Sequence, residues 1–76
     1  MVVKFENLLL IGCRSWVNKT GQTVSGGVLY NPDTSATLAF TAEREVKDSL
    51  APVSGSLDIS VMKGKGGAEW VKVKLL

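Results

Sequence analysis

Apolar and polar residues alternate along most of this chain with a period of two, which is typical of β-strands that bury one face. The alternation holds in five runs that are separated by turn-forming residues. These runs are Val2–Val17, Thr23–Tyr30, Ala36–Ala42, Ser56–Met62 and Glu69–Leu75. The pattern therefore predicts a chain built mainly from five short strands.

Glycine, proline and asparagine mark the expected turns and irregularities. Turn sequences separate the strands at Asn18–Gln22, Asn31–Asp33 and Gly64–Gly67. Within the long first run, we expect a bend at Gly12, because a glycine brings no side chain to the bend. Gly26-Gly27 predicts a bulge or a kink in the second run.

The periodicity changes between the third and fourth runs. Ala42, Val46 and Leu50 are four residues apart, which places them on one face of a short helix. Thr41 is suited to cap its start, and Pro52 ends it. The predicted order is thus three strands, a short helical crossover and two strands.

Five short strands need protection for their edges, and closure into a barrel provides it. The order β-β-β-α-β-β is that of the OB-fold, so we predict a single all-β domain of OB type that spans all 76 residues. An SH3-like barrel is the alternative, but it lacks a helical segment at this place.

The composition argues against catalysis. The chain contains no histidine, which removes the commonest general base and the commonest metal ligand. Cys13 is the only cysteine, so neither an internal disulfide nor a cysteine-rich zinc site can form. We expect a protein that is not an enzyme and that uses no cofactor, no metal and no small-molecule substrate.

The lack of disulfides in so small a domain favours a reducing compartment, and we expect the cytoplasm. The longest wholly apolar run is Leu8–Ile11. A membrane-spanning helix needs about 20 such residues, so no membrane association is expected.

The net charge of +2 is small, but its distribution is uneven. Cations outnumber acids in residues 1–30 and 63–76, whereas acids outnumber cations in residues 31–62. If the two ends lie side by side, they form a basic patch, which is the usual footprint of a nucleic-acid contact.

Two tryptophans fall on predicted outward faces beside these cations. Trp16 shares its face with Arg14, and Trp70 shares its face with Lys72 and Lys74. The opposite faces of the last two strands, including Val61 and Val71, are expected to point inward. A surface on which rings stack on bases and cations hold phosphates is typical of proteins that bind single-stranded nucleic acid.

The alternative interpretation is that each tryptophan is a half-buried core or dimer residue, covered by lysine stems. On the nucleic-acid interpretation, the stacking residues are Trp16, Trp70 and Tyr30. The candidate phosphate ligands are Arg14, Lys19, Lys63, Lys65, Lys72 and Lys74.

The chain resembles the small OB-fold single-stranded DNA-binding proteins of bacteriophages, especially those of filamentous phages. Arg14–Tyr30 resembles the DNA-binding hairpin of that family, although Val24 stands where the family usually has an aromatic residue. The other similar segments are Leu38–Phe40, Leu50–Leu57 and Glu69–Leu75. By analogy, Arg14, Lys19 and Tyr30 would contact DNA.

The resemblance implies a homodimer that coats single-stranded DNA without sequence preference, in the replication of a phage or mobile element within a bacterial host. A small core and a long first strand also favour a dimer, with a contact expected at Val2, Val3, Leu8 and Leu10. Two alternatives are a protein-interaction or phage assembly module and an RNA-binding protein of cold-shock type.

Overall fold

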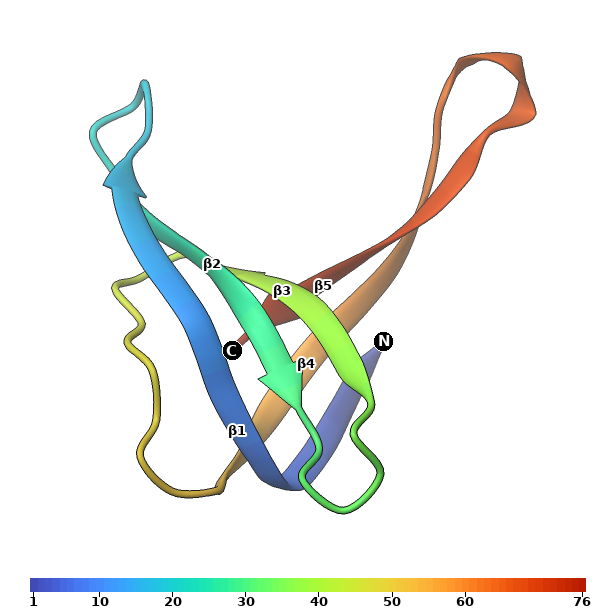
Figure 1. The fold of residues 1–76 in the computed structure, drawn as a ribbon. Coiled ribbons are helices and arrows are strands. Elements are labelled where there is room, and N and C mark those ends of the chain that lie inside the picture. Colours follow the sequence, from blue (N-terminus) through green and yellow to red (C-terminus); the bar gives the residue numbers. More distant parts are fainter.

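The computed structural model describes residues 1–76 and contains five strands that close into one barrel (Figure 1). The strands are β1 (Val2–Val17), β2 (Thr23–Tyr30), β3 (Thr37–Ala42), β4 (Val53–Lys63) and β5 (Glu69–Leu75), with a 3-10 turn, η1 (Lys65–Gly67), before β5. The spatial order is β1-β2-β3-β5-β4, and β4 pairs with β1. Only the β3–β5 pair is parallel. The predicted all-β barrel is confirmed, and its strand order fits the OB type.

Two irregularities bend β1 so that one strand pairs with both β2 and β4. The register with β2 shifts between Ile11 and Arg14, where Gly12 has a φ of 61°. The register with β4 shifts near Asn7, which has a φ of 56°. The bend at Gly12 is confirmed. The bulge predicted at Gly26-Gly27 is wrong, because β2 pairs with β3 without interruption there and the extra residue lies in β1.

The core lies inside the barrel and draws on every strand except β1, which packs partly buried residues against it. The fully buried apolar residues are Leu29, Phe40, Ala42, Val46, Leu57, Val73 and Leu75. Leu8 and Leu10 pack against this core, because the bends in β1 turn them inward. Of the expected dimer contact, only Val2 and Val3 therefore remain exposed.

The predicted helical crossover is wrong, because residues 43–52 form an extended loop. The Oγ of Ser25 accepts a hydrogen bond from the backbone N–H of Val46 (2.9 Å) and donates one to the carbonyl of Arg44 (2.7 Å). Ser49 forms two hydrogen bonds with the backbone of Leu10. These bonds to β1 and β2 occupy the backbone groups that a helix would pair internally. Leu50 is consequently fully exposed instead of facing the core.

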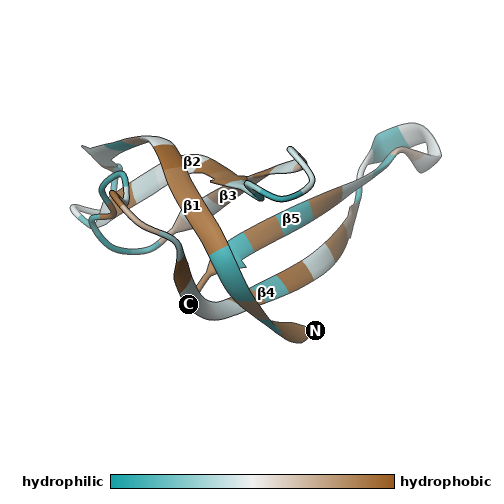
Figure 2. Cartoon of the chain, turned by 60° about the horizontal axis from the view of Figure 1, so that its bottom comes forward, coloured by the Kyte–Doolittle hydropathy of each residue, from teal (hydrophilic) through white to brown (hydrophobic).

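Two hairpins extend beyond the barrel on the same side, and the turn between β2 and β3 lies at the opposite end (Figure 1). We call residues 14–26 the β1–β2 arm and residues 60–72 the β4–β5 arm. Hydrophobic and hydrophilic residues alternate along β4 and β5 out into the second arm (Figure 2). Val61 and Val71, expected to point inward, are exposed there because the barrel ends before they are reached. No helix in the structure has the length and hydrophobicity of a membrane span.

Candidate nucleic-acid interface

Trp16 lies near the end of β1 with its indole against a glycine of the neighbouring strand. It is paired with Val24, and its ring reaches diagonally to Gly26, where a Cβ atom would lie 3.4 Å from the ring. The side chain is nevertheless 48% exposed. The indole is therefore supported by the backbone of β2 while much of its surface stays open to solvent.

Trp70 repeats this arrangement on the other arm. It is paired with Met62 and reaches diagonally to Gly64, where a Cβ atom would lie 2.7 Å from the ring. Its side chain is 52% exposed. An aromatic ring over a cross-strand glycine is a known stabilising arrangement in sheets. It also fixes the orientation of an exposed ring, which a stacking platform requires.

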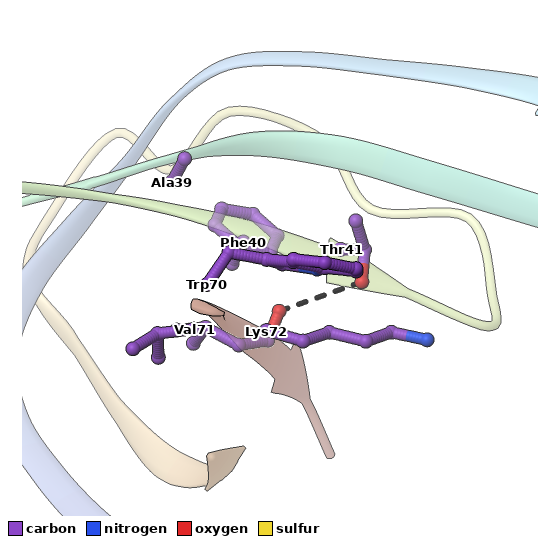
Figure 3. A pocket seen from close by; sticks show the side chains of 7 residues that line it. Ala39, Phe40, Thr41, Trp70, Val71 and Lys72 are labelled. Atoms are coloured by element: carbon purple, nitrogen blue, oxygen red, sulfur yellow. Dashed lines mark hydrogen bonds between the residues drawn. The ribbon is translucent and has the colours of Figure 1, made fainter. Parts of the chain in front are cut away.

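A hollow of about 210 Å³ opens beside Trp70, between β3 and β5. The two strands pair only at Thr41–Lys74 and Ala42–Leu75, so they diverge toward the β4–β5 arm. Figure 3 shows the indole of Trp70 edge-on beside Phe40 and Thr41, with the side chain of Lys72 extended alongside. The dashed line marks the bond from the Thr41 hydroxyl to the carbonyl of Val73 (3.4 Å).

A second hollow, of about 250 Å³, connects the two arms. Trp16 lines it from β1, Thr41 from β3, and Lys72 and Lys74 from β5. Lys72 also lines the hollow beside Trp70, so the two hollows adjoin. We call the surface made by Trp16, Gly26, Thr41, Trp70, Lys72 and Lys74 the saddle. The saddle brings together cations and aromatic rings from both ends of the chain.

The cations around the saddle differ in their partners. Lys74 forms an ion pair with Glu43 (Nζ to Oε1, 3.5 Å), whereas Lys72 has no acidic partner within 4 Å. The other predicted phosphate ligands also form no ion pair, and all are exposed on the arms or near their bases: Arg14, Lys19, Lys63 and Lys65. A cation without an acidic partner can bind a phosphate without first breaking an ion pair.

Tyr30 lies apart from the two tryptophans. It ends β2 and pairs with Leu9 and Thr37, at the end of the barrel opposite the arms. Its alternation with the buried Leu29 places it on the outer face of β2, and the length of the strand carries it away from the saddle. The structure therefore brings together Trp16, Trp70, Lys72 and Lys74, and leaves Tyr30 outside this group.

The sequence did not indicate a role in binding for Glu43 or Gln22. Glu43 lies in the segment predicted to be helical, and Gln22 lies in a predicted turn. Both line the hollow beside Trp16. Glu43 follows directly on β3 at a bend, and its position depends on long-range bonds that hold residues 43–52 away from a helix. No local pattern in the sequence carries that information.

Cys13 and Asp48 form a structural contact at the bend of β1. The Asp48 carboxylate accepts a hydrogen bond from the Cys13 backbone N–H (2.7 Å), and this bond lowers the pKa of Asp48. Burial, reinforced by the same carboxylate, raises the pKa of the Cys13 thiol. A thiol with a raised pKa is a poor nucleophile. We therefore assign this pair to holding the loop 43–52 against β1.

The structure contains no group of three or more His, Cys, Asp or Glu side chains placed to hold a metal ion. Comparison of the chain with protein-family models, with curated proteins and with solved structures found no match. The function must therefore be argued from the saddle and the arms themselves.

Proposed function

We propose that this protein binds single-stranded DNA without catalysing a reaction, and that the saddle is its binding surface. One observation carries the proposal: Trp16 and Trp70, each half exposed and each supported by a glycine, stand on either side of the unpaired Lys72. Exposed rings offer stacking to unpaired bases, and each such contact stabilises a complex by about 1–3 kcal/mol. Lysines between and beyond the rings would follow the phosphates.

The geometry favours a single strand over a duplex. In a duplex the bases are stacked on one another, so their faces are not available to side chains. The two hollows are shallow and adjoin, and they offer room for individual bases beside each tryptophan. In keeping with the resemblance to phage proteins, we propose that the chain coats single-stranded DNA during replication of a phage or mobile element, in the cytoplasm of its bacterial host.

We expect thymidine oligonucleotides to quench the tryptophan fluorescence of the protein, because a base stacked on Trp16 or Trp70 changes the surroundings of the indole. A titration at low salt with micromolar protein measures this directly. Unchanged fluorescence together with no shift on a native gel would contradict DNA binding. Tighter binding of a uridine oligonucleotide of equal length would instead support the RNA-binding alternative.

We also propose that the protein is a homodimer and that the β4–β5 arm forms its contact. Val61 and Val71 are directly paired across β4 and β5, and they are 62% and 59% exposed. They lie on the face of the arm opposite Met62 and Trp70. A two-stranded ribbon that exposes apolar residues on both faces is not expected to be stable alone.

A second copy of the chain suits the Val61–Val71 face. A two-fold axis brings the same patch of each protomer together, so the valine pair would meet its own equivalent. Lys63 and Glu69 form the next pair on the same face, two positions beyond these valines, and carry opposite charges. If the arms of two protomers cross in opposite directions, Lys63 of each can lie near Glu69 of the other while the valines are buried between them. The outer face, with Trp70, stays open to DNA.

Sedimentation at micromolar concentration should report twice the mass of one chain. Val71→Lys should give a monomer, because it places a charge in the apolar contact, and the exposed position makes the substitution compatible with folding. Val2→Lys is the matched control, since Val2 is equally exposed on β1. A monomeric wild type, or a dimer that only Val2→Lys dissociates, would contradict a contact through the arm.

A further inference from the structure

We infer that the hollow beside Trp16 holds one nucleobase and prefers a base with an amino group, such as cytosine, over thymine, with Glu43 as the residue that discriminates. The inference rests on the proposed function, and it adds a base preference to a surface that would otherwise bind any sequence. Glu43 places a carboxylate in the hollow that Trp16, Lys72 and Lys74 also line. A surface that only bound phosphates would not be expected to carry a negative charge there.

The strand registers place Glu43 across the hollow from Trp16. Trp16 is paired with Val24 of β2, and Ser25 is paired with Ala42 of β3. Glu43 follows Ala42 directly, at a bend just beyond the end of β3, and it lines the same hollow as Trp16 and Val24. Trp16 thus faces this hollow from the side of β1 and Glu43 from the side of β3, with β2 between them. The hollow, of about 250 Å³, leaves room for one base between the ring and the carboxylate.

The charge of Glu43 works against phosphate binding at this spot. Its contact with Lys74 is long at 3.5 Å, and both side chains remain accessible to solvent. An ionised carboxylate only accepts hydrogen bonds. Within a DNA strand, it can therefore be matched only by N–H groups, which are found on the edges of the bases.

The bases differ in what they offer to a carboxylate. Cytosine presents its N4 amino group as a donor, and acidic side chains accept from it, whereas thymine presents the O4 acceptor at the corresponding position. The carboxylate of Glu43 would be attracted to the amino group, whereas on thymine it would meet a single donor, N3–H, between the carbonyl acceptors O2 and O4, which repel it. Cytosine is thus a better partner for this residue than thymine.

The neighbours of Glu43 complement the remaining edge of such a base. The amide of Gln22 lines the same hollow and forms no side-chain hydrogen bond within the protein. Its backbone is held in place because the Asn18 Oδ1 accepts from the N–H of Gln22 (3.0 Å). Gln22 and Lys72 can donate to the ring nitrogen or carbonyl that lies next to the amino group. The hollow therefore offers an acceptor beside donors, which matches the adjacent amino group, ring nitrogen and carbonyl of cytosine.

The test compares oligonucleotides of cytidine and of thymidine, of equal length, by fluorescence titration at one salt concentration and neutral pH. The wild type should bind the cytidine oligonucleotide about five- to tenfold more tightly, the lower part of the range for a hydrogen-bonded base contact. Glu43→Ala should bind both oligonucleotides with equal affinity. Glu45→Ala removes the same charge from an exposed residue outside the hollow, and it should keep the wild-type preference.

Equal affinity of the wild type for the two oligonucleotides would overturn the inference and leave DNA binding intact. A preference that survives in Glu43→Ala would also overturn it, since the discrimination would then come from another residue. Binding to neither oligonucleotide would overturn the proposed function, and the base preference with it.

Discussion

Replacing Trp70 with alanine is expected to weaken the binding of a thymidine oligonucleotide by about 1–3 kcal/mol, without changing how that binding depends on salt. The ring is half exposed and lies over Gly64, so its removal takes away a stacking surface and releases few ions. Lys72→Ala should behave differently. Loss of one phosphate contact on a single strand reduces the slope of log K against log salt by about 0.7.

The comparison needs a control lysine and a test of folding. Lys47 lies in the loop 43–52, where it forms an ion pair with Glu45 (3.7 Å). Lys47→Ala should therefore change the affinity for the oligonucleotide and the salt slope less than Lys72→Ala does. Lys74→Ala should alter the slope less than Lys72→Ala, because Lys74 is already neutralised in part by Glu43. Thermal unfolding of each variant shows whether it still folds.

Two results would contradict this division of roles. If Trp70→Ala unfolds the protein, the indole serves the hairpin rather than a ligand. If Trp70→Ala stays folded and changes the salt slope while Lys72→Ala does not, the ring and the lysine have been assigned the wrong functions. Trp16→Ala provides an independent repeat, because Trp16 has the same exposure and the same glycine support on the other arm.

The strands could be predicted from the sequence because their signals are local. Alternation with a period of two, interrupted by Gly and Pro turns, located β1, β2 and β5 to the residue. The same alternation correctly placed Trp16 and Trp70 on outer faces. It could not show where a strand leaves the barrel, so Val61 and Val71 were assigned to the interior although they lie on the arm.

The features that the sequence did not predict depend on contacts between residues far apart in the chain. The glycines beneath the tryptophans were read as a bulge and a flexible turn, because their role depends on the diagonal neighbour in the paired strand. The Ala42-Val46-Leu50 spacing is genuinely helical, but hydrogen bonds to residues more than 20 positions away determine the conformation of this segment. Tyr30 shows a further limit: the sequence named it as a stacking residue, but its distance along β2 excludes it from the saddle.

Ser25 joins the loop 43–52 to β2 by two hydrogen bonds, and Ser25→Ala should destabilise the protein strongly. The side chain is completely buried, and its Oγ bonds the N–H of Val46, the carbonyl of Arg44 and the Oγ of Ser15. Without it, a buried N–H and a carbonyl lose their partners, at a cost of about 1–3 kcal/mol for each group left unpaired. A total loss of about 2–6 kcal/mol is expected for the two groups, against a typical stability of about 5–15 kcal/mol for a whole domain.

Urea unfolding of Ser25→Ala measures this loss, and Ser54→Ala is the matched control. Ser54 is exposed on β4 and its hydroxyl forms no hydrogen bond within the protein, so its removal should change the free energy of unfolding by less than about 0.5 kcal/mol. Amide hydrogen exchange adds a local readout, because Val46 should lose protection before the strands do if Ser25 holds it in the core. Equal stability of the two variants would show that the burial of Val46 fixes the loop without the serine.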